Sequence, residues 1–169
     1  MRSATARAWA LAGLVCALVV GADQAAKAAI EAHLVPGQYE EVLGPLELTL
    51  SHNRGVAFGL AGGAGVKLVL TTAIALAVIG YLFARNPRRP GMWLATGLVA
   101  GGAIGNLVDR MMYGKVTDFI VWKVGVHEWP AFNIADAALC IGVGLMLLDM
   151  LLASRSARKT EARTPPEKA

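Results

Sequence analysis

Charged side chains are scarce in this chain of 169 residues: they make up 17% of it, whereas hydrophobic residues make up 56%. Soluble domains carry about 25% charged residues, so this composition indicates a membrane protein. The formal net charge is +4, but the basic residues neither gather on one face nor alternate with aromatic residues, which speaks against a nucleic-acid partner. They lie instead beside apolar runs, as topology signals do.

The motifs of several enzyme classes are also missing. Cys16 and Cys140 lie inside apolar runs, with no zinc-type spacing and no disulfide framework. There is no HExxH motif, and the glycine-rich residues 59–65 lack the Lys-Ser/Thr of a phosphate-binding loop. None of the histidines belongs to a Ser–His–Asp motif. We therefore expect neither a metal nor a cofactor.

Four apolar stretches, each near the roughly 20 residues that a bilayer requires, predict four transmembrane helices. They cover residues 8–29, 66–83, 92–108 and 134–153. The first stretch has features of a signal peptide, but three further spans favour a retained helix. The sequence thus predicts an integral membrane, mainly α protein with a single membrane-embedded domain over residues 1–153. Residues 154–169 are polar and contain proline, which predicts a disordered tail.

The distribution of Lys and Arg predicts the orientation. Both terminal segments and the loop at 84–91 are rich in these residues, whereas the segment between the first two spans holds four glutamates against Arg54 alone. By the positive-inside rule, both termini are cytoplasmic and the two longer connections face outward.

The two outward connections have patterns of their own. Residues 46–52 alternate leucine with polar residues, which predicts a half-buried strand, and the LGPL turn at 43–46 predicts a small antiparallel β-hairpin. Residues 118–129 place Trp122 and Trp129 among polar residues. This pattern predicts an interfacial segment at the lipid–water boundary.

The third span ends in a polar cluster. Glycines recur every four residues from 97 to 105, a stripe suited to close helix packing. One turn further along the same face is Asp109, and the neighbouring face carries Asn106 and Arg110. Close packing alone does not require these polar side chains.

Three further acids each have a purely structural interpretation. Asp23 and Lys27 are one helical turn apart and can neutralise each other. Asp136 follows Asn133 by three residues, as in a helix N-cap, and Asp118 can cap the interfacial segment. However, these acids and that of the third span all map to the outward side of the membrane. Several carboxylates at one depth indicate a functional site.

Since the serine-protease, metal and phosphate-binding motifs are missing, paired carboxylates are the catalytic arrangement that the sequence still offers. Two aspartates held close together do not both ionise readily, so one keeps a proton while the other is charged. The ionised carboxylate can take a proton from water while the protonated one donates to a carbonyl oxygen, which is peptide hydrolysis by an aspartyl dyad. These considerations leave open which two of the four acids pair.

A small proton-coupled membrane transporter subunit is the alternative, because intramembrane acids also mark ion pathways. Transport favours acids at the bilayer midplane and an internal repeat, whereas these acids lie at one boundary and the two halves show no repeat. An assembly factor that packs through the glycine stripe would leave the polar residues without a role.

Five motifs, in order, resemble those of the lipoprotein signal peptidase (signal peptidase II) family. They are DQAAK (23–27), NRGVAFG (53–59), GGAIGNLVDR (101–110), VTDF (116–119) and FNIAD (132–136). The resemblance extends from about residue 8 to residue 153. It implies an intramembrane aspartyl endopeptidase of the bacterial inner membrane, which removes the signal peptide from prolipoproteins just before a diacylglyceryl-modified cysteine.

The resemblance also implies roles for individual residues. Asp118 and Asp136 would be the catalytic pair. Independently of the resemblance, the helix dipole favours the ionised form of Asp136, which would make it the base, with Asp118 protonated. The residues that bind substrate or support the pair would be Asp23, Lys27, Asn53, Gly55, Asn106, Asp109, Arg110 and Asn133. The family has a small extracytoplasmic β-cradle and is the target of globomycin. We expect the diacylglyceryl prolipoprotein and membrane lipid as partners, no cofactor, a monomer, and an active site near the periplasmic face.

Overall fold

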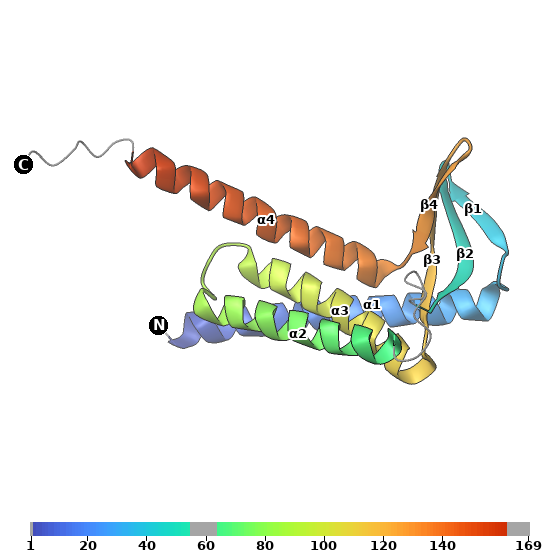
Figure 1. The fold of residues 1–169 in the computed structure, drawn as a ribbon, viewed down its shortest axis with the longest axis horizontal. Coiled ribbons are helices and arrows are strands. Elements are labelled where there is room, and N and C mark those ends of the chain that lie inside the picture. Colours follow the sequence, from blue (N-terminus) through green and yellow to red (C-terminus); the bar gives the residue numbers. More distant parts are fainter. Residues whose placement is uncertain (1, 55–63, 162–169) are drawn as a thin grey trace, which may run out of the picture.

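The computed structural model describes residues 2–54 and 64–161, and its ribbon is shown in Figure 1. The helices are α1 (Arg2–His33), α2 (Ala64–Arg85), α3 (Met92–Tyr113) and α4 (Ile134–Glu161). The strands are β1 (Tyr39–Leu43), β2 (Leu46–Asn53), β3 (Val116–Val124) and β4 (His127–Phe132). All neighbouring strands are antiparallel, and they form one sheet in the order β1-β2-β3-β4.

Three of the described helices are long and apolar enough to cross a membrane, namely α1, α2 and α4, over Ser3–His33, Lys67–Arg85 and Ile134–Ser154. Large apolar side chains on their surfaces are exposed, such as those of Leu14 and Ile74, as expected for helices that face lipid. The fourth predicted span, in α3, is not confirmed on these grounds. Its glycines and the polar residues near its C-terminal end lower its hydropathy.

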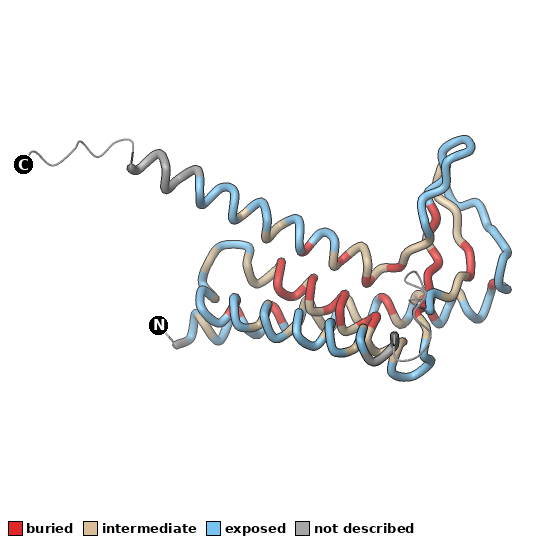
Figure 2. Tube along the Cα trace, viewed as in Figure 1, coloured by how far each residue is buried: buried red, intermediate tan, exposed pale blue. Residues whose placement is uncertain are grey.

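Helix α3 lies against α1, α2 and α4, and Figure 2 shows buried residues along α3 and β3. The predicted glycine stripe explains the close approach of α1. A Cβ atom at Gly97 or Gly101 would lie 2.7 Å from the Cβ of Val15 or Val19. Gly102 faces α4 instead, where a Cβ atom would lie 2.3 Å from the carbonyl oxygen of Ala135. Only glycine lets the backbones meet at these distances.

Helix α4 continues to Glu161, so residues 154–161 of the predicted disordered tail are helical. Five of these eight residues are Ala, Arg, Lys or Glu, which favour helix, and the prolines of the tail come later, at 165 and 166. Residues 162–169 lie outside the described residues.

The predicted hairpin is confirmed as β1 and β2, with Gly44 in the turn at a φ of 54°. The segment 118–129, predicted at the lipid–water boundary, forms most of the β3–β4 hairpin. The alternating side chains of Phe119 and Val121 are buried, and β3 pairs with β2. Asp118 therefore lies inside a strand and caps no helix.

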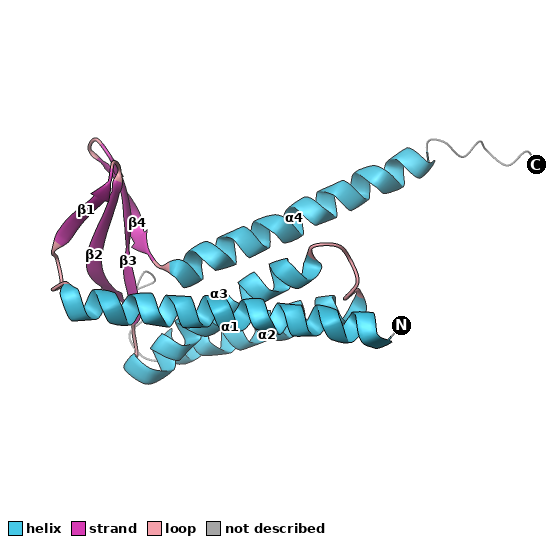
Figure 3. Ribbon diagram, turned by 180° about the vertical axis from the view of Figure 1, so that it is seen from behind, coloured by secondary structure: helices cyan, strands magenta, loops and turns pink. Residues whose placement is uncertain are grey.

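The sheet stands at one end of the helices (Figure 3), where α1 ends and α4 begins. The N-terminus of the chain and the far end of α4 lie at the opposite end. The C-terminal ends of α1 and α3 contact β3, and Asn133, just before α4, bonds to Asp118 of β3.

Candidate active site

Two very short connections hold the candidate catalytic residues on regular backbone. Helix α3 ends at Tyr113, the next residue, Gly114, has a φ of 67° that lets the chain reverse, and β3 begins at Val116. Asn133 alone separates β4 from α4. Asp118 on β3 and Asp136 in the first turn of α4 are therefore fixed by the elements that carry them.

Asn133 contacts both aspartates and is completely buried. Its Nδ2 donates a hydrogen bond to Oδ1 of Asp118 over 2.7 Å, and its Oδ1 accepts the backbone N–H of Asp136 over 2.9 Å. The backbone N–H of Asn133 donates in return to Oδ2 of Asp136 over 3.3 Å. This reciprocal pattern confirms the predicted N-cap and ties the two acids to one side chain.

The environment of Asp118 favours its protonated form. Burial, and after it the nearby charge of Asp136, raises the pKa of Asp118 to about 6. Hydrogen bonds from Asn53 and Asn133 and the charge of Lys27 lower the same pKa but do not outweigh burial. The two carboxyl groups thus interact, as in a pair that shares one proton.

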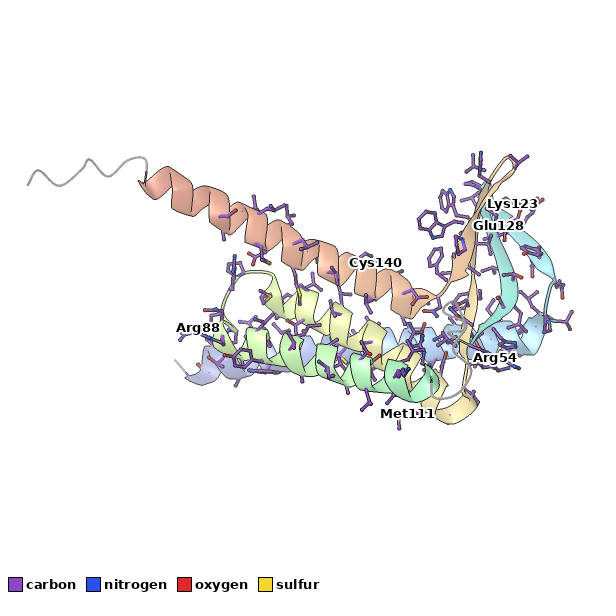
Figure 4. The ribbon with its side chains drawn as sticks, viewed as in Figure 1. Arg54, Arg88, Met111, Lys123, Glu128 and Cys140 are labelled. Atoms are coloured by element: carbon purple, nitrogen blue, oxygen red, sulfur yellow. The ribbon has the colours of Figure 1, made fainter. Side chains whose placement is uncertain are left out.

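Asp136 is only partly buried and lies at the edge of a groove of about 510 Å³ between β4 and α4. The rest of the lining carries no charge: Trp129, Pro130, Ala131, Phe132, Ala137, Leu139 and Cys140. Figure 4 labels Cys140 on α4. Nδ2 of Asn106 donates to Oδ1 of Asp136 over 2.7 Å. The groove can thus hold an apolar ligand beside one carboxylate.

A buried ion network lies behind the two aspartates. Nζ of Lys27 is 2.6 Å from Oδ2 of Asp23 and 2.7 Å from Oδ2 of Asp109. It also donates to Oδ1 of Asn106 over 3.3 Å. The predicted pair of Asp23 and Lys27 is therefore present, and Asp109 of α3 completes it.

Two of the remaining predicted residues contact members of the site. Arg110 donates from its guanidinium to the backbone oxygen of Asn106 over 3.4 Å. Asn53, at the end of β2, is exposed but hydrogen bonds to Asp118. Gly55 lies outside the described residues. Arg54 is exposed and is labelled in Figure 4.

Two residues of the site do not follow from the sequence reasoning. Gln24 donates to Oδ1 of Asp109 over 2.8 Å. Thr117 donates its hydroxyl to Glu31 over 2.6 Å and its backbone N–H to Oδ2 of Asp109 over 3.3 Å. Gln24 lies inside the motif DQAAK and Thr117 inside VTDF, and only these positions in the sequence indicate a role in the site.

The described residues contain no group of three or more His, Cys, Asp or Glu side chains placed to hold a metal ion. The site contains the buried carboxyl of Asp118, the carboxyl of Asp136 in the lining of an apolar groove, and amide side chains that hydrogen bond to both. Such a pair can move a proton to and from water and a carbonyl oxygen.

The chain is similar to known membrane peptidases. A family model described as signal peptidase (SPase) II matches residues 15–152. The lipoprotein signal peptidase of Teredinibacter turnerae is 41% identical over 154 residues, which cover 88% of this chain and 92% of that protein. That of an Azoarcus species is 40% identical over 146 residues, which cover 84% and 83%.

A solved structure described as a bacterial membrane enzyme, determined by the in meso method at 1.9 Å resolution, is 34% identical with a TM-score of 0.78. The match covers 83% of this chain and 92% of that chain. The transporter alternative gains no support from these matches. The fold and the matches agree: the chain belongs to the signal peptidase II family and is a peptidase of the bacterial inner membrane.

Proposed function

We propose that Asp118 and Asp136 are the catalytic pair of an aspartyl endopeptidase that cleaves prolipoproteins just before the diacylglyceryl-modified cysteine. The observation that carries this proposal is the contact of Asn133, at the junction of β4 and α4, with both acids. The relatives named above are lipoprotein signal peptidases, which supports the same substrate here.

We assign Asp136 as the ionised member of the pair, which acts as the general base. Its carboxylate accepts hydrogen bonds from Asn106 and from the backbone of Asn133, and the N-terminus of α4 favours negative charge. Asp118 is the better acid, because its pKa is raised to about 6.

The reaction then needs only these two carboxyls and water. Asp136 takes a proton from the water as the water oxygen attacks the scissile carbonyl carbon, and Asp118 gives its proton to the carbonyl oxygen. In the second step the C–N bond breaks. Asp136 gives its proton to the leaving amine nitrogen, and a hydroxyl of the tetrahedral intermediate returns a proton to Asp118, which yields a carboxylic acid and restores the pair.

The location of the site suits a lipidated substrate. Acyl chains and a signal helix partition into the bilayer, and the apolar groove at Asp136 lies where the membrane-spanning α4 begins. We expect the enzyme to work as a monomer among membrane lipids and to be inhibited by globomycin.

The orientation follows from the basic residues. The loop between α2 and α3, which contains Arg88, lies at the opposite end of the molecule from Lys123 and Glu128 of the β3–β4 hairpin (Figure 4). By the positive-inside rule, this loop and both termini are cytoplasmic, and the active site is near the periplasmic face. Helix α3 then returns from that loop to the site as the fourth span, because its 22 residues extend about 33 Å at 1.5 Å per residue.

The test is the pair of variants Asp118→Asn and Asp136→Asn, purified and incubated with a diacylglyceryl prolipoprotein. Each should lower the cleavage rate by at least about 10³-fold, as loss of a catalytic group does in other peptidases. Asp149→Asn is the matched control, because Asp149 pairs with Arg89 over 2.6 Å at the cytoplasmic end. Near-normal cleavage by either folded dyad variant would refute the proposal.

A further inference from the structure

Strand β4 is an edge strand that borders the groove at Asp136. The sheet has the order β1-β2-β3-β4, so among the described strands β4 has a neighbour on one side only. Figures 1 and 3 both show β4 on the side of the sheet that faces α4. Its residues 129–132 line the groove together with Asp136 and other residues of α4. The free edge of β4 and one candidate catalytic carboxyl therefore border the same space.

The backbone of Glu128 in β4 points its hydrogen-bonding groups toward this free edge. Glu128 lies opposite Lys123 of β3, and the N–H of Lys123 donates away from β4, to the backbone oxygen of Pro45 over 2.7 Å. In an antiparallel ladder, two residues directly opposite each other point their N–H and C=O groups either toward each other or away from each other. The N–H and C=O of Glu128 are therefore directed away from β3.

The ladder between β3 and β4 is also interrupted beside the groove. Its register shifts between Ile120 and Trp122, so that Pro130 and Ala131 of β4 lie opposite Val121 alone. A bulge of this kind leaves backbone groups of the longer strand without a ladder partner. Proline has no N–H, but its carbonyl oxygen is still an acceptor. Backbone groups beside an apolar groove are costly to leave unpaired, so this edge favours a ligand that hydrogen bonds to a strand.

An extended peptide has the matching groups. A strand that pairs with β4 would lie about 4.8 Å from it and would exchange N–H and C=O hydrogen bonds with its edge. From Glu128 to Phe132 the edge extends about 13 Å at about 3.3 Å per residue. Asn133 follows directly and bonds to Asp118, and Asp136 lines the same groove. A peptide on the edge of β4 therefore leads its backbone to both aspartates.

We propose that the segment of the prolipoprotein next to the scissile bond binds as a fifth strand on the free edge of β4. This inference rests on the proposed function of the two aspartates, and it adds how the peptide is held. Hydrogen bonds to the main chain give affinity that depends little on side chains, so substrates of different sequence can bind in the same way. The apolar lining of the groove, such as Trp129 and Leu139, then contacts the apolar parts of the same substrate.

A strand can be tested through its period of two. In a synthetic diacylglyceryl prolipoprotein peptide, each amide within four residues of the scissile bond, but not the scissile amide itself, is replaced in turn by an ester, which has no N–H. The wild-type full chain is used, and kcat/KM is measured for each peptide. On one side of the scissile bond, every second ester should lower kcat/KM by about 3- to 10-fold, as loss of one hydrogen bond does. The esters between them should have no effect, because those amides face away from β4. A profile without this alternation would overturn the inference.

A pair of variants tests whether β4 is the partner strand. Glu128→Pro removes the outward N–H at an edge position, where proline is tolerated. Glu128→Ala is the matched control, because both variants lose the hydrogen bond from Tyr39 to the Glu128 carboxylate over 3.4 Å. We expect kcat/KM to be about 3- to 10-fold lower for Glu128→Pro than for Glu128→Ala. Equal values in the two folded variants would contradict pairing with β4.

Hydrogen exchange of the wild type covers the case in which Glu128→Pro does not fold. A peptide whose scissile amide is reduced to an amine cannot be cleaved, and its binding should slow exchange of the Glu128 amide; unchanged exchange at saturation would refute the pairing. Cleavage of the unmodified substrate by Asp118→Asn would instead refute the proposed dyad, so the two failures are distinguishable.

Discussion

The contact between α3 and α4 at Gly102 gives the sharpest test of how the fold positions the dyad. A Cβ atom at this position would lie 2.3 Å from the backbone oxygen of Ala135 and 3.0 Å from Cβ of Leu139. Ordinary contacts of a Cβ atom begin at 3.4 Å. Since a backbone oxygen in a helix has no rotamer to change, Gly102→Ala must push α4 away by about 1 Å at the residue before Asp136.

The expected cost has two parts. Overpacking of this kind lowers the free energy of unfolding by about 1–3 kcal/mol. A displacement of about 1 Å at a catalytic group lowers the rate by about 10²-fold. Because Ala135 also donates its N–H to Asp23 over 2.9 Å, the same displacement strains the hydrogen bond that holds the start of α4.

The assay is the cleavage rate of a diacylglyceryl prolipoprotein, measured alongside Tm. Gly144→Ala is the matched control on α4, because a Cβ atom there would have no neighbour within 4 Å. That variant should keep its rate, and its stability should change by no more than about 1 kcal/mol. If Gly102→Ala keeps both the rate and the Tm of wild type, helix contact at this glycine does not position Asp136.

Two further predictions concern the acids and their cap. Because the folded pKa of Asp118 is about 6 against an ordinary 3.8, kcat/KM should fall as pH rises through about 6 and the acid loses its proton. Between these two pH values the folded state keeps this proton while the unfolded state releases it. The contribution of Asp118 to stability is therefore present below about pH 4 and is lost as pH rises through about 6. The Tm of wild type relative to Asp118→Asn should decline over that range, and a constant difference would contradict the assignment. Asn133→Ala removes the cap of α4 and the donor to Asp118. The free energy of unfolding should therefore fall by about 1 kcal/mol, and kcat should fall by about 10²-fold. A loss of stability with kcat intact would limit Asn133 to capping.

The features that the sequence predicts correctly are local ones. Apolar runs mark α1, α2 and α4, alternation marks β2, and the spacing of three or four residues marks the pairs Asp23–Lys27 and Asn133–Asp136. Each of these patterns follows from the period of one helix or strand, so a single segment contains all the information.

The β3–β4 hairpin shows where local patterns fail. Its tryptophans and charges do not predict that the segment forms two strands, and pairing with β2 decides that outcome. The same holds for α3, whose glycines are favourable only because α1 and α4 lie close enough to fill the space. Hydropathy alone therefore leaves the role of α3 as a span undecided.

The five motifs identify the family and name the two candidate catalytic aspartates, but their spacing does not explain what holds those residues. Asn133 lies between Asp118 and Asp136, Lys27 between Asp23 and Asp109, and Thr117 is bonded to Glu31. Apart from the cap at the start of α4 and the Asp23–Lys27 pair within α1, these contacts cross from one element to another, and no periodicity encodes the partner of a side chain on a different element. Sequence determined which residues carry charge and which faces are apolar. Tertiary packing decided which charges meet, because only the close approach of α1, α3, α4 and β3 excludes water from between them.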